Sequence, residues 1–356
     1  MCTQLMEAEV SAKTGAAKHQ QTSERSSSRS GCRVRRFDTR LGTTYLLVPK
    51  IRNGGYIPFF VSDYKCSEAA LIQVIQEAYI QGVSTRKMEK VAESLGIQSL
   101  SRSQVSEITK GLNEQAESFR NRPLEGSYPL IWVDALYEKV RLDGRVITMA
   151  IQVVCGINEE GLREVLALEP MLEESEESYR SLFQSMRKRG FGTPKLIISD
   201  AHSGLVAAIR SRFPGSSWQR CTVHFMRNIL VHVPKSEKQR FADLLKLIWQ
   251  AGNAEEAKVV AQRLVSLYER RYPKAVATLE DGLEDSLTFF AFPMLDSRKV
   301  SSTNLLERLN KEIRRRTKVI GIFPNPDSDT RLISMYLLEY SEEWSTSRAY
   351  LSAASM

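Results

Sequence analysis

Several common sequence features are absent from this chain of 356 residues. No apolar run approaches the ~20 residues that a helix needs to cross a bilayer, so we expect no membrane-spanning segment. The first 30 residues hold no apolar stretch of the kind found in secretory signal peptides, which indicates a cytoplasmic protein. Neither GxxxxGK(S/T) nor GxGxxG occurs, so the sequence indicates neither nucleotide hydrolysis nor a dinucleotide cofactor.

Cysteine is scarce: the chain has five, an odd number and widely spaced, which is typical of a reducing compartment and unlike a disulfide framework. Cys221 and His224 form a Cys-x-x-His pair, which is half of a zinc site. A structural zinc ion needs four ligands, and only His202 and His232 lie nearby in the sequence. We therefore favour a local packing or substrate-facing role for His224 over a zinc site.

The charge balance is basic. The formal net charge is +8 and the isoelectric point is about 9.2, while 42% of the residues are hydrophobic. That hydrophobic content, over this length, predicts a folded protein of two or three domains. An excess of lysine and arginine favours a polyanionic partner, because neutralising phosphates releases condensed counterions.

Two different segments begin the chain. Residues 1–30 are rich in Ser, Thr, Gln, Lys and Arg without periodicity, so we expect a disordered basic N-terminus. From Arg33 onward the pattern becomes β-like, with a turn at 53–55. We predict a small β-rich segment at 31–62.

Residues 63–122 have the periodicity of helices, which Gly96 interrupts. Ser101 and Gln104 then form a capping box that opens a further helix. A helix, a turn with glycine and a capped second helix are typical of a helix-turn-helix, although a plain helical bundle has the same pattern. The outward residues of the capped helix, which are of the types that contact DNA in the major groove, are Arg102, Ser103, Gln104, Ser106 and Lys110.

Two aspartates accompany the apolar runs of residues 123–220. Asp134 lies in such a run before Asp143 and Gly144, a pair that predicts a hairpin turn. Asp200 directly follows a short apolar run typical of a central parallel strand, and ligands gather at the carboxyl ends of such strands. Each aspartate alone is more often part of an Asx turn or a helix N-cap than of a functional site.

A third carboxylate lies on a helix predicted over 300–317. Glu307 shares a polar face of this helix with Lys311 and Arg314. The opposite, apolar stripe consists of Leu305, Leu306, Leu309 and Ile313. Alternatively, Asn304 and Glu307 form a capping box and the arginines are a solvated last turn. Three carboxylates on two strands and a helix suggest a shared site.

The three acidic residues belong to longer motifs that occur in a fixed order. The motifs are Val133-Asp-Ala-Leu-Tyr137, Ile198-Ser-Asp-Ala-His-Ser-Gly-Leu205, Cys221-x-x-His224 and Thr303-Asn-x-x-Glu-Arg-x-Asn-x-Glu-Ile-Arg-Arg-Arg-Thr317. In this order they resemble the mutator-type transposases of bacterial insertion sequences, from about residue 31 to the C-terminus.

The resemblance implies an α/β fold: a ribonuclease H-like catalytic domain with an all-helical insertion, preceded by a helix-turn-helix DNA-binding region. We accordingly expect the first part of the catalytic core at 123–220 and the insertion at 221–295. The glutamate helix would follow at 296–325 and a C-terminal helix at 326–356.

The resemblance also implies a chemistry. Asp134, Asp200 and Glu307 would form a DDE triad that holds Mg²⁺, with Mn²⁺ able to substitute, for in-line phosphodiester displacement. The remaining basic residues, which would hold the phosphate backbone, are Lys311, Arg314, Arg315 and Arg316. The implied partners are the double-stranded DNA of the element's terminal inverted repeats, the target DNA and further copies of the chain, in the bacterial cytoplasm at the nucleoid. Two alternatives stay open: a nuclease that only cuts, and a silent element remnant that only binds DNA.

Overall fold

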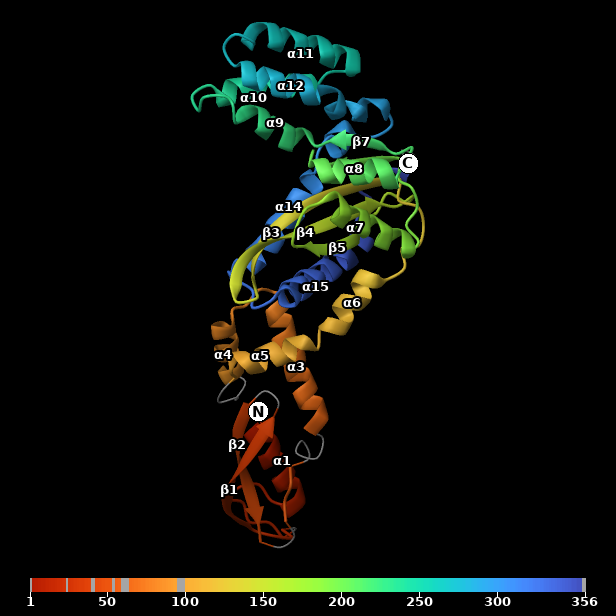
Figure 1. Cartoon of the computed structure of the whole chain (residues 1–356). Coiled ribbons are helices and arrows are strands. Elements are labelled where there is room, and N and C mark those ends of the chain that lie inside the picture. Colours follow the sequence, from red (N-terminus) through yellow and green to blue (C-terminus); the bar gives the residue numbers. More distant parts are fainter. Residues whose placement is uncertain are drawn as a thin grey trace. The chain divides into compact units, whose positions relative to one another are not determined.

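A computed structural model of the chain describes residues 2–23, 25–39, 42–52, 55–58, 64–94 and 100–353. These residues form a mixed α/β protein with one mixed sheet and many helices, as the sequence predicts (Figure 1). The chain divides into two compact units, Met1–Asn113 and Glu114–Met356. Within the described ranges, no helix is both long and apolar enough to cross a membrane.

The first unit begins with a helix, which corrects the prediction of a disordered N-terminus. Helix α1 (Cys2–Thr14) packs on strand β2 (Gly42–Ile51), which pairs antiparallel with β1 (Arg29–Thr39). Met6 and Val10, one helical turn apart, are buried in a small core with residues of β2. The polar composition of this segment concealed the apolar pair, which packs the helix against the strands.

The remainder of the first unit is helical. Its helices are α3 (Tyr64–Ile80), α4 (Thr85–Ser94) and α5 (Arg102–Lys110). Helix α5 starts with the predicted capping box: the Gln104 backbone N–H donates to Ser101 Oγ at 3.2 Å, and the Ser101 N–H donates to Gln104 Oε1 at 2.8 Å. Val105 and Ile108 are buried, as the periodicity predicts, whereas Gly96 lies outside the described residues.

A five-stranded sheet organises the second unit. Its strands in chain order are β3 (Leu130–Leu142), β4 (Arg145–Ile157), β5 (Arg163–Met171), β6 (Leu196–Ser199) and β7 (Ser217–Arg220). Across the sheet the order is β5-β4-β3-β6-β7. Strand β4 runs antiparallel to its neighbours β3 and β5, and β6 and β7 run parallel to β3. The β3–β4 turn is formed by Asp143 and Gly144, both with positive φ, as the sequence predicts.

Side chains alternate across β3 and so face two different helical layers. Ile131 and Val133 share a core with α7 (Glu176–Lys188) and α8 (Ser203–Arg212), the helices that connect β5, β6 and β7. Trp132 and Asp134 point the other way, toward α14 (Asn304–Thr317) and the segment before it. A later helix, α15 (Pro326–Ser345), packs on β3 and β5.

A helical block separates β7 from α14 in the chain (Figure 1). Its helices are α9 (Thr222–Leu230), α10 (Lys238–Trp249), α11 (Ala254–Tyr268), α12 (Pro273–Ser286), the 3₁₀ turn η1 (Thr288–Ala291) and α13 (Ser297–Val300). The block has its own hydrophobic core, in which the Phe241 ring packs edge-on against Tyr268 at 4.9 Å between centroids. This block occupies the place of the predicted insertion between Asp200 and Glu307.

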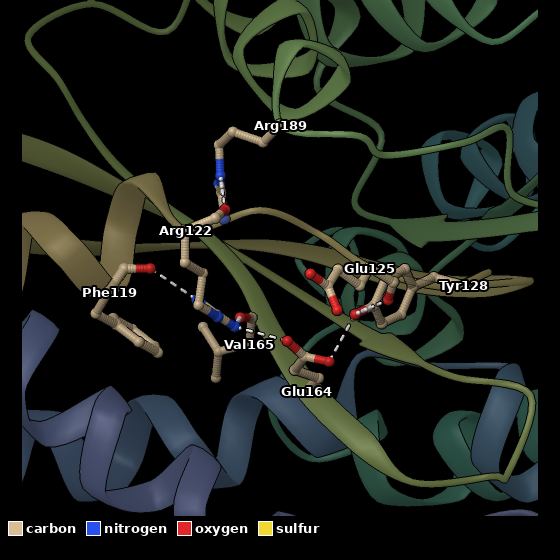
Figure 2. A network of polar contacts seen from close by, with 7 residues as sticks. All are labelled: Phe119, Arg122, Glu125, Tyr128, Glu164, Val165 and Arg189. Atoms are coloured by element: carbon tan, nitrogen blue, oxygen red, sulfur yellow. Dashed lines mark hydrogen bonds and ion pairs between the residues drawn. The ribbon is translucent and has the colours of Figure 1, made fainter.

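The entry into the second unit is fixed by Arg122, which follows helix α6 (Asn113–Asn121) (Figure 2). Its guanidinium donates to the Phe119 carbonyl at 2.8 Å and to Glu164 Oε1 on β5 at 2.8 Å. Tyr128 Oη donates to the other oxygen of Glu164 at 2.6 Å. These bonds join the end of α6 and the residues before β3 to strand β5. Helix α6 therefore belongs almost entirely to the second unit, whereas the sequence interpretation grouped it with the preceding helices.

Candidate active site

The three acidic residues singled out in the sequence line one pocket of about 440 Å³. They reach it from three elements: Asp134 from β3, Asp200 from the end of β6, and Glu307 from the first turn of α14. The other residues that line the pocket are Ala135, Tyr137, His224, Arg227, Asn310, Lys311 and Arg314. Polar groups therefore converge from the sheet, the glutamate helix and the first helix of the inserted block.

Asp134 is the most deeply buried of the three carboxylates, with 8% of its surface exposed. Burial raises the pKa of Asp134 to about 7, and the negative charges of Asp200 and Glu307 contribute to the rise. Its Oδ2 accepts a 2.9 Å hydrogen bond from Asn310 Nδ2 on α14. A carboxyl group in this state is costly to ionise unless a positive charge joins the pocket.

Asp200 lies immediately after β6, where Ser199 fixes the strand end. Ser199 Oγ accepts a 2.9 Å hydrogen bond from Trp218 Nε1 of β7 and donates to the Asp200 carbonyl at 2.8 Å. Asp200 Oδ1 in turn accepts a 3.3 Å bond from the backbone N–H of His202. The aspartate thus closes a local turn, as one sequence interpretation predicts, and it also lines the pocket.

Glu307 is held by two residues of α9. Its Oε1 lies 2.8 Å from Arg227 Nη2 and 3.3 Å from His224 Nε2. The capping alternative for Glu307 is wrong, because α14 is capped at Thr303 without any side-chain cap bond. Instead, the Thr303 backbone N–H donates to Cys221 Sγ at 3.3 Å.

The segment before α14 is tied to the sheet and to α9 at successive residues. The Ser301 carbonyl accepts from the Thr222 N–H at 3.0 Å, and the Ser302 carbonyl accepts from Trp132 Nε1 at 3.1 Å. With the bond between Cys221 and Thr303, these contacts set where α14 starts and hence where Glu307 lies. Cys221 is buried and positions this helix, so the cysteine of the Cys-x-x-His pair has a packing role.

The side chains as they stand do not form a ready-made metal site. Across the part of the chain that the structure describes, no group of three or more His, Cys, Asp or Glu side chains is placed to hold a metal ion. Glu307 faces Arg227, and Asp134 faces Asn310. The donor set nevertheless suits a hard cation, because carboxylate oxygens converge and the Asn310 Oδ1 atom is buried without a hydrogen-bond partner among the described residues.

The basic residues of α14 separate into two groups. Lys311 and Arg314 line the pocket, and Arg315 pairs with Glu312 on the same helix at 2.9 Å. Arg316 is buried: its guanidinium lies 3.2 Å from Glu339 and 4.0 Å from the Tyr336 ring centroid on α15. The prediction that Arg316 holds a phosphate backbone is therefore wrong, because α15 takes up its charge.

The candidate DNA contacts of α5 lie in the other unit. Ser103, Ser106 and Lys110 are exposed, and Lys110 pairs with Glu107 at 2.8 Å. Gln104 is half-buried, and its carbonyl oxygen serves the capping box. The side chain of Arg102 lies outside the described residues.

Two polar residues of the pocket, Asn310 and Arg227, had no role in the sequence interpretation. Asn310 follows Glu307 by three residues, and Arg227 follows His224 by three. This spacing puts each pair on one face of a helix, so helical periodicity could have found both.

The site and the sheet define a mixed α/β protein with a carboxylate pocket between its central strands and a glutamate helix. Sequence comparison agrees: the profile of the Mutator family of transposases matches residues 1–347. This chain therefore belongs to the Mutator family of transposases.

Individual relatives support the same assignment. The transposase of insertion sequence IS256 in transposon Tn4001 of Staphylococcus aureus is 40% identical over 352 residues, which covers 98% of this chain and 90% of the relative. The transposase of IS1081 from Mycobacterium tuberculosis is 40% identical over 349 residues, 98% of this chain and 84% of the relative. The transposase of ISRM5 from Rhizobium meliloti is 38% identical over 348 residues, which covers 98% of this chain and 87% of the relative. The similarity therefore extends into the N-terminal segment, beyond the predicted start near residue 31.

Proposed function

We propose that this chain is the transposase of an insertion sequence, which binds the ends of its element and cuts and joins DNA strands. The observation that carries the proposal is the pocket in which Asp134, Asp200 and Glu307 converge beside Lys311 and Arg314. Carboxylates that can hold a metal ion, next to cations that can hold phosphates, suit phosphodiester chemistry. The names of the curated relatives, all transposases of insertion sequences, agree with it.

We assign the second unit to the ribonuclease H-like fold. Three antiparallel strands followed by two parallel ones, with helices between β5, β6 and β7, support this assignment. So does the position of the carboxylates at the centre of the sheet, one on β3 and one at the end of β6. The helices α9 to α12 would then be an insertion before the glutamate helix.

The residues that would hold Mg²⁺, or Mn²⁺ in its place, are Asp134, Asp200 and Glu307. When bound, the metal would supply positive charge to activate the attacking oxygen and to stabilise the leaving one. The pKa of Asp134 is raised first by burial and then by the negative charges of Asp200 and Glu307, so a bound cation would favour its ionised form. Arg227 and His224 hold Glu307 in the absence of one.

The chemistry has two steps on the same kind of bond. Water first attacks a phosphorus at the element end, which breaks the bond to the 3′ oxygen and frees a 3′-OH. That 3′-OH then attacks a phosphorus of the target DNA, so one phosphodiester forms as another breaks. Lys311 and Arg314 would neutralise the phosphate oxygens beside the reacting centre.

DNA recognition belongs, in this proposal, to the first unit. We assign α4 and α5 to a helix-turn-helix, on the basis of the capped α5 and its core of Val105 and Ile108. Its ligand would be the double-stranded DNA of the terminal inverted repeats. Two element ends must be handled together, so we infer that several copies of the chain assemble on DNA.

The test uses a duplex that carries the inverted repeat flanking this gene, incubated with Mg²⁺ and a target plasmid. The wild-type protein is expected to cut the repeat and join it to the plasmid. Asp134→Asn and Asp200→Asn are expected to bind the duplex with unchanged affinity but to give neither product. Cutting without joining would identify a nuclease, and binding without either product by the wild type would identify a remnant that only binds DNA.

A further inference from the structure

A second pocket adjoins the carboxylate pocket on the side of the helical block. It has a volume of about 390 Å³ and shares Asp200, His224 and Arg227 with the carboxylate pocket. Its additional polar lining comes from Arg220, His202 and Asn228. Because three residues line both pockets, the two cavities are neighbours, and one extended ligand can occupy both. The added lining includes one side chain that is always positively charged, Arg220.

Arg220, the last residue of β7, is built into this pocket. Its guanidinium stacks on the ring of Phe225 at 4.1 Å from the centroid. Gly282 of α12 leaves room for it: a Cβ atom at Gly282 would collide with Arg220 Nη1 and would lie 2.7 Å from the Phe225 ring. A flat cation sandwiched in this way keeps its orientation, which a flexible surface arginine does not.

Among the described residues, no hydrogen bond or ion pair involves the Arg220 side chain, although it is half-buried and near Asp200, Asp281 and Asp285. Arg122 and Arg316, by contrast, each have a carboxylate partner within 3.2 Å. An oriented guanidinium with open donors that faces a cavity fits a bidentate anion.

We propose that Arg220, together with Arg227 and Asn228, binds a second backbone phosphate of the DNA strand whose reacting phosphate occupies the carboxylate pocket. The guanidinium fork matches two phosphate oxygens, and the Asn228 amide supplies a further donor. This inference rests on the proposed function, because it needs a DNA strand in the carboxylate pocket.

The experiment measures binding of the flanking-repeat duplex by fluorescence anisotropy in EDTA, where no strand is cut. Arg220→Gln is expected to weaken binding about tenfold, as for one lost hydrogen bond to a charged group, and to lower the salt dependence by about one phosphate contact. Arg263→Gln on α11 is the matched control: Arg263 is exposed and lines neither pocket, so less than a twofold change is expected.

Gly282→Ala provides a second variant that keeps the charge. The added methyl group displaces the Arg220 guanidinium from the Phe225 ring, so a similar loss of affinity is expected from a protein with unchanged net charge. Thermal unfolding of each variant shows whether it is folded. If Arg220→Gln does not fold, Gly282→Ala decides the question.

A scan with single methylphosphonates, each of which removes the charge of one phosphate, locates the contact. At one position of the DNA, the methylphosphonate is expected to weaken binding by the wild-type protein but not to weaken binding by Arg220→Gln any further. Equal affinity and equal salt dependence of the folded variants and the wild type would overturn the inference and leave the proposed function intact. A wild-type protein that does not bind the duplex would refute the proposed function and the inference together.

Discussion

Asn310 on α14 donates a 2.9 Å hydrogen bond from its Nδ2 to Oδ2 of Asp134 on β3. Both side chains are buried, and this bond joins the glutamate helix directly to the strand of the first carboxylate. Glu307, one helical turn before Asn310, is thereby held at a fixed position relative to Asp134. The other polar atom of the Asn310 amide, Oδ1, is buried and has no hydrogen-bond partner among the described residues.

Replacing Asn310 should therefore disturb the proposed metal site rather than the fold. Asn310→Ala removes the donor that orients Asp134, and we expect cleavage to fall at least tenfold, which corresponds to one lost hydrogen bond to a charged group. The concentration of Mn²⁺ needed for half-maximal binding, measured by calorimetry without DNA, should rise as well. An unchanged Mn²⁺ midpoint in Asn310→Ala would show that Asn310 does not position Asp134 for a metal.

A second prediction concerns DNA recognition by α5. The combined change of Arg102→Ala and Ser103→Ala should weaken binding to the inverted repeat much more than binding to random DNA, because base contacts carry specificity and phosphate contacts do not. Gln104 is a poor choice for this test, since its side chain also caps the helix. Competition binding with both DNAs gives the two affinities.

Lys110→Ala is the control within the same helix, because Lys110 is exposed and already paired with Glu107. We expect it to change both affinities by a similar small factor. If the Arg102 and Ser103 changes also reduce both affinities equally, α5 contacts only the DNA backbone.

The periodicity of the sequence predicted what local patterns can decide. The apolar stripe of α14 is buried, the Asp143–Gly144 turn closes a hairpin, and Ser101 and Gln104 cap α5. In each case, hydrophobic spacing or turn chemistry within a few residues sets the local structure.

Partners from distant segments could not be predicted in that way. Arg316 lies in a run of arginines that looks solvated, yet it is buried against Glu339 and Tyr336, which lie one helical turn apart on α15. Likewise, nothing near Cys221 in the sequence indicates that its sulfur meets Thr303, 82 residues later. The convergence of Asp134, Asp200 and Glu307 was expected mainly from the family resemblance, since strand and helix patterns alone left other roles open.

A third prediction concerns the pH dependence of stability. Asp329 on α15 is fully buried, and neither carboxylate oxygen has a hydrogen-bond partner among the described residues. Burial raises the pKa of Asp329 to about 8, with a smaller contribution from the charge of Glu138. In the unfolded chain the pKa returns to about 4, so the folded state binds the extra proton between these values.

The sign follows directly: the stabilising contribution of Asp329 is complete below about pH 4 and is lost as the pH rises through about 8. Asp329→Asn should make the free energy of unfolding less dependent on pH in this window. The comparison is best made in the Asp134→Asn background, because the raised pKa of Asp134 acts in the same direction. Urea unfolding at pH 5 and pH 8 measures how much the free energy of unfolding changes with pH. An equal change with and without Asp329→Asn would contradict the prediction.

The last prediction concerns Glu307 and has a matched control on the same helix. If Glu307 holds a metal ion, Glu307→Gln removes the anionic oxygen that Mg²⁺ requires and should abolish both cutting and joining. Arg227, the ion-pair partner of Glu307, is largely exposed. Loss of this ion pair should therefore cost at most about 1 kcal/mol of stability.

Glu312→Gln makes the same chemical change five residues later, at a residue that pairs with Arg315 and lies outside the carboxylate pocket. It should leave both reactions within about twofold of the wild type, since exposed ion pairs contribute little. Thermal unfolding checks that both variants are folded. Glu307→Gln should remain folded, because loss of the negative charge of Glu307 relieves its repulsion with Asp134. A Glu307→Gln protein that still joins the repeat to target DNA would exclude Glu307 as the third carboxylate, whereas equal loss in Glu307→Gln and Glu312→Gln would indicate that α14 needs both charges for its position rather than one for chemistry.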